Sequence, residues 1–258
     1  VTIQGITASL PGAPPFLEIE AAAIRIHPVD WLIGRPYVSG ASILHPQVTL
    51  RRDSSGGWEV LALGRKAVTP GSNGASTLAD RLAFELSDLE IHIATPEELV
   101  SRLYDDLELV YERPGRRLEV RLVNGMEKAT LELERGDAMR CRFDVRELSP
   151  ALAAPFIGRI IDLEAARLSA TGEAARSETG AIDARDRGQV ENVTVDLALV
   201  SKQRADGIGF GFEVDLHGVN RTWLVRHSAF ALGGETVTVT GTIAESPEAG
   251  RIVNLRAA

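Results

Sequence analysis

Residues 139–146 read Met-Arg-Cys-Arg-Phe-Asp-Val-Arg, and this stretch indicates the fold of the chain most clearly. Every odd residue in it is apolar and every even residue is charged. Side chains of a β-strand point alternately to its two faces, so the stretch predicts a strand with one apolar and one solvated face. The same alternation recurs in Leu82-Phe84-Leu86, Leu89-Ile91-Ile93, Leu118-Val120-Leu122 and Phe210-Phe212-Val214-Leu216. Many such strands in series predict a large sheet whose apolar side must be covered by a second sheet, by helices, by a partner or by lipid.

The sequence therefore predicts a mostly β fold, of the β-rich α+β kind. We expect a long antiparallel meander, shaped as a curved groove or a sandwich, because hairpin-like connections separate the strand patterns between residues 163 and 255. Two or three short helices accompany the sheet: one over 28–34, one near 96–105 and one near 150–160. The last contains Pro155, which disfavours the interior of a helix.

The helix near 96–105 is predicted from its first turn. Thr95-Pro96-Glu97-Glu98 offers a threonine cap, a proline at the first helical position and a glutamate at the third, which together form a capping box.

Three regions follow from composition. Residues 1–66 form an N-terminal β region with its short helix, and residues 78–258 form the antiparallel meander. Residues 67–77, which are small, polar and contain two glycines and a proline, are expected to be a flexible linker. The alternative is one continuous sheet running through both regions.

Charge and cysteine content exclude some functions. The net charge of -8 argues against nucleic-acid binding, which needs a clustered excess of Lys and Arg. Cys141 is the single cysteine, so no internal disulfide can form. It lies among the apolar residues of its alternating strand, where we expect a free cysteine to pack as a small apolar side chain.

The search for catalytic, metal-binding and cofactor-binding residues yields none. The five histidines form no metal-ligand spacing, and His92 falls on the polar face of its strand. Glycosidases need two carboxylates held on opposite sides of a cleft, and no residue flanking Asp105-Asp106 suggests such a cleft. The glycines of residues 207–211 alternate with strand residues instead of following a nucleotide-binding pattern. We therefore expect a non-enzymatic protein without cofactor.

One phrase carries a family resemblance. Residues 36–58 read Pro-Tyr-Val-Ser-Gly-Ala-Ser-Ile-Leu-His-Pro-Gln-Val-Thr-Leu-Arg-Arg-Asp-Ser-Ser-Gly-Gly-Trp. Together with the preceding strand from about residue 15 and the short helix ending at Gly34, this resembles the AsmA-like proteins of the bacterial envelope, which include the TamB and YhdP relatives. The match covers about residues 15–60. The rest of the chain shares with the family only the alternation of apolar and polar residues in successive strands.

The resemblance implies a periplasmic module with a curved β-sheet groove that carries lipid acyl chains on its apolar face. It also implies association with the inner membrane through an anchor segment outside this chain. The residues expected to face lipid are Phe84, Leu109, Leu122, Phe143 and Phe212. The alternative is a structural or protein-interaction domain of a larger envelope protein, for example beside a peptidoglycan glycosyltransferase, with a closed core and no lipid.

Overall fold

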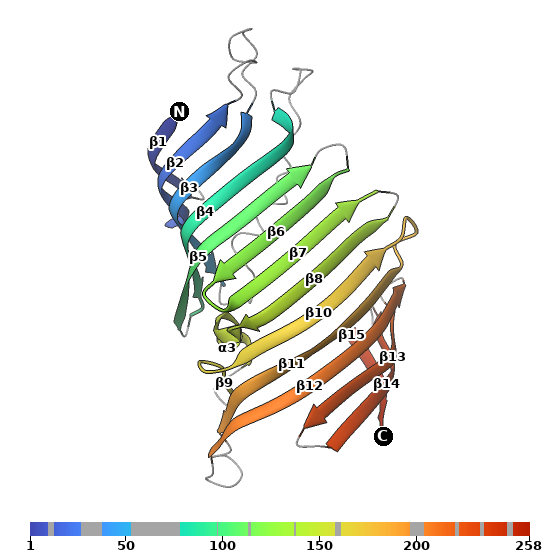
Figure 1. Cartoon of the computed structure of the whole chain (residues 1–258). Coiled ribbons are helices and arrows are strands. Elements are labelled where there is room, and N and C mark those ends of the chain that lie inside the picture. Colours follow the sequence, from blue (N-terminus) through green and yellow to red (C-terminus); the bar gives the residue numbers. More distant parts are fainter. Residues whose placement is uncertain are drawn as a thin grey trace. The chain divides into compact units, whose positions relative to one another are not determined.

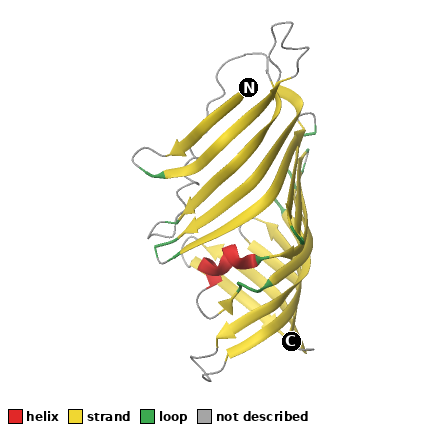
Figure 2. Cartoon of the chain, turned by 60° about the vertical axis from the view of Figure 1, so that its left-hand side comes forward, coloured by secondary structure: helices red, strands yellow, loops and turns green. Residues whose placement is uncertain are grey.

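The computed structural model describes most of the chain, and nearly all described residues lie in strands (Figures 1 and 2). The described residues are 1–9, 13–26, 38–52, 78–96, 98–112, 115–136, 138–157, 161–196, 204–219, 222–232, 235–246 and 250–258. In this part of the chain, 15 strands form one open, mostly antiparallel sheet in which neighbours follow chain order. The predicted mostly β fold with an antiparallel meander is thus confirmed.

The chain divides into two compact units. Unit 1 consists of Val1–Pro114, Val120–Gly125 and Ala151–Phe156. Its strands are β1 (Thr2–Ser9), β2 (Pro15–Ile26), β3 (Val38–Arg51), β4 (Leu78–Ala94), β5 (Leu99–Glu112) and the second part of β6 (Arg117–Asn124).

One pair of unit 1 departs from the expected meander, because β3 and β4 run parallel. Parallel neighbours need a crossover connection of a dozen or more residues, and residues 52–77 between them are long enough to supply one. The predicted linker at 67–77 and the predicted helix at 28–34 lie outside the described residues. The strands on the two sides of 67–77 pair directly and belong to the same unit.

β4 joins two alternating runs that look separate in the sequence. The apolar residues are even-numbered up to Leu86 and odd-numbered from Leu89 onward. Asp88, with a φ of 57°, lies between the two runs, and a residue in this left-handed conformation lets a strand change phase locally. Leu82 and Ile93, in different runs, are both only 7% exposed, so both phases contribute to the buried side.

The helix predicted near 96–105 is wrong, since residues 99–105 belong to β5. The predicted cap interaction does form, with the backbone N–H of Glu98 donating to Oγ1 of Thr95 over 3.2 Å, but it closes the turn between β4 and β5. Pairing with β4 places Tyr104, 5% exposed, opposite Leu89, and leaves Leu99 64% exposed. Burial in the sheet therefore overrides the local helix signal.

The helix predicted near 150–160 is present as a 3₁₀ turn at Pro150–Ala153 followed by α3 at Ala154–Ile157. Figure 2 shows this helical segment in red, whereas most of the described residues are drawn as strands. Pro155 is the second residue of α3, where its missing N–H costs no helical hydrogen bond.

Unit 2 consists of Gly115–Glu119, Met126–Pro150 and Ile157–Ala258. Beyond the start of β6, its strands are β7 (Glu127–Arg135), β8 (Met139–Leu148), β9 (Ile161–Asp162), β10 (Arg167–Arg176), β11 (Ile182–Asp196), β12 (Arg204–Val219), β13 (Thr222–Leu232), β14 (Glu235–Ser246) and β15 (Gly250–Ala257). They form a meander from β7 to β15, with β9 paired to β11 off the main path. A small closed core lies near β9, where Leu163, Ala166 and Val193 are at most 5% exposed.

Candidate functional site: the apolar face of unit 2

Register places the alternating residues of unit 2 in lateral rows, because residues paired across neighbouring strands share a face. Three adjacent rows cross from β7 to β14, and we call them together the apolar face. The row of Cys141 contains Leu133, Cys141, Ala174, Ala184, Leu216, Val225 and Gly241. The row of Phe143 contains Leu131, Phe143, Gly172, Asp186, Val214, Ser228 and Val239. The row of Phe212 contains Ala129, Val145, Ala170, Gly188, Phe212, Phe230 and Val237.

Large parts of the apolar face are exposed. Phe230 is 44% and Val237 48% exposed, and Phe210, which lies two residues before Phe212 on the same side of β12 and next to the three rows, is 36% exposed. Phe143 and Phe212 themselves are half-buried. Contiguous exposed apolar residues on a soluble protein are typical of a surface that binds another apolar body.

The two phenylalanines lie over glycines of the neighbouring strands. A Cβ added to Gly172 would come within 2.6 Å of the ring of Phe143, and a Cβ added to Gly188 would come within 2.8 Å of the ring of Phe212. Aromatic side chains of a sheet commonly cover a glycine in this way. The rings are thereby held against the sheet. Their strands, β8 and β12, are three strand spacings apart, which corresponds to about 14 Å.

The other predicted lipid-facing residues belong to unit 1. Phe84 of β4 and Leu109 of β5 are direct partners in register and are both half-buried. Leu122 of β6 is buried, with 9% exposure. The structure thus places the five predicted residues in two groups, Phe84, Leu109 and Leu122 in unit 1 and Phe143 and Phe212 on the apolar face of unit 2.

Sequence reasoning missed one feature of the apolar face, the carboxyl of Asp186. It occupies the apolar phase of β11, between Ala184 and Gly188, and the signal that could have revealed it is this break in the alternation. Burial raises the pKa of Asp186 above its ordinary value. The pKa of the Cys141 thiol is also raised, first by burial and then by the charge of Asp186.

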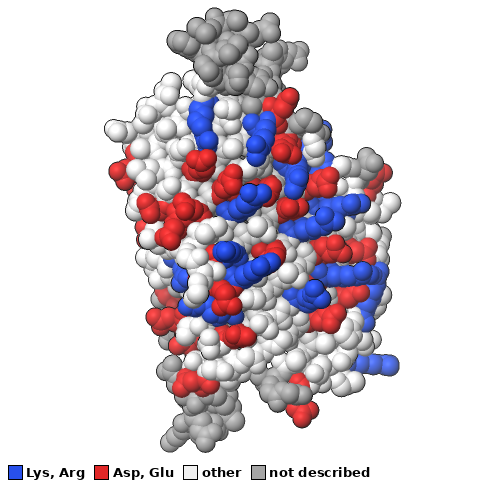
Figure 3. All heavy atoms as spheres, viewed as in Figure 1, with Lys and Arg blue, Asp and Glu red and all other residues white. Residues whose placement is uncertain are grey.

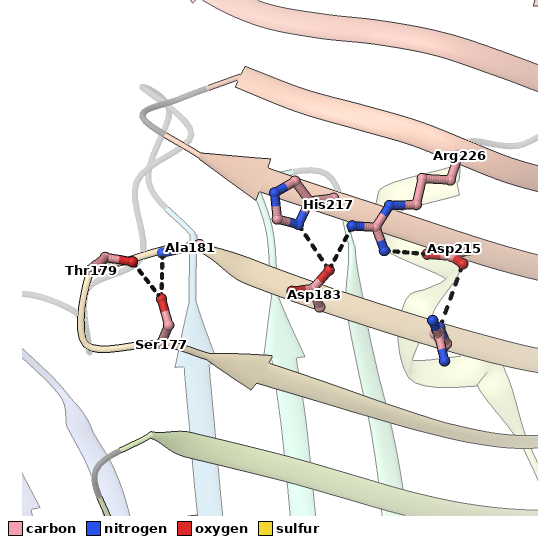
Figure 4. Close-up of polar contacts among 8 residues, drawn as sticks. Ser177, Thr179, Ala181, Asp183, Asp215, His217 and Arg226 are labelled. Carbon is pink, nitrogen blue, oxygen red and sulfur yellow. Dashed lines mark hydrogen bonds and ion pairs between the residues drawn. The ribbon is translucent and has the colours of Figure 1, made fainter.

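The opposite face is charged. Figure 3 shows acidic and basic side chains interspersed over the face that it views. In unit 2 these charges form a network on β11, β12 and β13, drawn in Figure 4. Asp183 lies 2.8 Å from Nδ1 of His217 and 3.1 Å from the guanidinium of Arg226. Asp215 lies 3.5 Å both from Arg226 and from Arg185.

The side chains of this network lie at the surface, with Arg226 38% and Asp183 53% exposed. The hydrogen bond from His217, together with the charges of His217 and Arg226, lowers the pKa of Asp183. Exposed ion pairs of this kind contribute little to stability, because water and salt screen the charges. A hollow of about 830 Å³ on this face is lined by residues such as Arg142, Glu173 and Glu213, whereas ligand pockets are mostly apolar.

Among the described residues, no group of three or more His, Cys, Asp or Glu is placed to hold a metal ion. His92, predicted on the polar face, lies 2.7 Å from the hydroxyl of Ser101 and 3.5 Å from Glu90. The ring is therefore occupied by ordinary polar contacts.

Comparison of the chain with protein-family models, with curated proteins and with solved structures finds no match. Within the described residues, none of the helices reaches the length and apolar character that crossing a membrane requires.

Proposed function

We propose that this protein is a non-enzymatic, AsmA-like module of the bacterial periplasm whose unit 2 binds lipid acyl chains across its apolar face. The observation that carries the proposal is the exposure of Phe230 and Val237 on that face and of Phe210 beside it. The family and the compartment rest on the resemblance of residues 15–60 to AsmA-like proteins.

The energetics favour hydrocarbon as the cover. Removing apolar surface from water is worth about 25 cal/mol per Å², or about 1.5–3 kcal/mol for a fully covered Phe, Val or Leu side chain. Acyl chains have no hydrogen-bonding groups of their own, so lying along Phe143, Phe212 and Phe230 leaves no polar group of the ligand unpaired. A chain running across the strands along the row of Phe212 would meet an alanine, valine, glycine or phenylalanine at every strand spacing of about 4.8 Å.

The alternative is a structural or protein-interaction domain of a larger envelope protein. Unit 1 favours this reading, because its own packing leaves Leu89 only 4% and Tyr104 only 5% exposed. A β-sheet of this kind can evidently bury its apolar residues without a ligand.

The test is native mass spectrometry with lipid extraction, on protein purified from a bacterial envelope without harsh detergent. The wild-type chain is expected to carry phospholipid at close to one equivalent or more. Val237→Glu, which places a charge on the apolar face, should lose most of it. Thr236→Glu is the matched control, because the neighbouring residue of β14 is also exposed but points to the opposite face. A stable wild-type monomer without lipid would overturn the proposal in favour of the interaction domain.

A further inference from the structure

Asp186 is the only charged side chain in the three rows that define the apolar face. Its register partners are Gly172 on β10 and Val214 on β12, in the same row as Phe143. A Cβ on Gly172 would collide with Oδ1 of Asp186 as well as with the ring of Phe143, so the carboxyl group lies in the space that the glycine leaves open. The carboxyl group thus lies within the surface that a ligand would cover.

Asp186 forms no hydrogen bond and no ion pair with any other described residue. The basic residues next to it in sequence, Arg185 and Arg187, point to the opposite face of β11 and are exposed. In the free protein, water can solvate the half-buried carboxylate. A hydrocarbon chain laid over it would remove this water and provide no donor in exchange, which is costly for a charged group.

We propose that Asp186 makes occupation of the apolar face proton-dependent: hydrocarbon covers the face when the carboxyl group is neutral and is disfavoured when it is ionised. This inference rests on the proposed function, since it concerns the same surface.

No charged side chain on the neighbouring strands faces Asp186 within the three rows, so none is placed there to stabilise its ionised form. Gly172 with Ala170 and Ala174 faces it from β10, and Val214 with its neighbours Phe212 and Leu216 from β12, and none of these is charged. Cys141 on β8 is a titratable group nearby, and burial raises the pKa of its thiol, which favours the neutral form.

Burial already disfavours the ionised form of Asp186, and a covering chain increases that burial. Binding therefore favours proton uptake, and by linkage the affinity for hydrocarbon rises as the pH falls. Each unit by which the ligand raises the pKa corresponds to a tenfold change in affinity. We expect binding to be roughly 3–10 times tighter at pH 4.5 than at pH 8.

The probe should be apolar and uncharged across this range, so we choose Nile red and follow its fluorescence with the purified chain between pH 4.5 and pH 8. Asp186→Asn keeps the shape of the side chain but cannot ionise, so its affinity should be independent of pH and close to that of the wild type at pH 4.5. Glu213→Gln is the matched control: it neutralises a carboxyl next to Val214 on the opposite face, and should keep the wild-type pH dependence. Circular dichroism at each pH checks that the fold is retained.

The outcomes separate the two proposals. Binding by the wild type that does not change with pH, or a pH dependence that persists in Asp186→Asn, overturns the role of Asp186 and leaves the proposed function standing. Absence of dye binding by the wild type and by Asp186→Asn at every pH overturns the proposed function. If Asp186→Asn fails to fold, the wild-type and Glu213→Gln profiles still decide, because a flat wild-type profile contradicts the inference.

Discussion

Replacing Gly188 by alanine tests the packing that holds Phe212 on the apolar face. The added Cβ would lie 2.6 Å from the backbone carbonyl oxygen of Ser169, 2.6 Å from Cβ of Ala170 and 2.8 Å from the ring of Phe212. Two of these contacts are with the paired strand β10, which cannot move away without loss of its hydrogen bonds to β11. The strands or the ring must therefore shift.

The cost can be separated from the general effect of changing glycine to alanine. Gly211, on the neighbouring strand β12, has its nearest atoms at 3.7 and 3.9 Å, which is ordinary contact. Gly211→Ala should stabilise the protein by about 0.5–1 kcal/mol, because alanine loses less backbone entropy on folding. Gly188→Ala shares this gain but adds overpacking of about 1–3 kcal/mol. The free energies of unfolding of the two variants should thus differ by about 1–3 kcal/mol.

Urea unfolding followed by circular dichroism measures this difference. With a slope of about 2 kcal/mol per M, the midpoint for Gly188→Ala should lie about 0.5–1.5 M below that for Gly211→Ala. Adding Phe212→Leu to Gly188→Ala should restore part of the loss, since the contact with the backbone of Ser169 remains. Equal midpoints for the two alanine variants would refute the close packing of β10, β11 and the Phe212 ring.

Two further results are expected. Tyr104→Ala should lower the free energy of unfolding by about 3–5 kcal/mol, as for buried aromatic residues, whereas Leu103→Ala, at a residue 49% exposed, should change it by less than about 0.5 kcal/mol; chemical denaturation of both variants checks this, and the reverse order would indicate a helix at this position in place of β5. His217→Ala should raise the pKa of Asp183 toward the ordinary range, because the hydrogen bond from His217 is the main cause of its lowered value. In the wild type this lowered pKa stabilises the folded state above about pH 4, and the contribution is lost as the pH falls through the folded-state pKa. An NMR titration of the Asp183 carboxyl carbon measures the pKa in the wild type and in the variant. An unchanged pKa in the variant would contradict the contact with His217.

The alternation of the sequence was sufficient to predict most of the strands of unit 2. The alternating stretch Met139–Arg146 lies within β8, and the run from Phe210 to Leu216 lies within β12. The prediction succeeded here because neighbouring strands are joined by short connections, so that chain order and sheet order coincide.

The errors occurred where local and tertiary preferences disagree. The capping signal at Thr95 is real, as its hydrogen bond with Glu98 shows, but pairing with β4 over the whole length of β5 outweighs one helical turn. Similarly, nothing in the alternation reveals that β3 and β4 run parallel, because the period of a strand is the same in both directions.

The candidate site shows the same division. That Phe143 and Phe212 point to an apolar face follows from the sequence alone, since a period of two residues assigns each side chain to one side of its strand. Only the register of β8 to β12 decides that they share the face with Asp186 and lie over Gly172 and Gly188. The same register places those residues on a side of unit 2 that is partly exposed, whereas Leu82, Leu89 and Ile93 of unit 1 are buried. Alternation is a property of each strand by itself, but register and exposure depend on contacts between residues far apart in the chain.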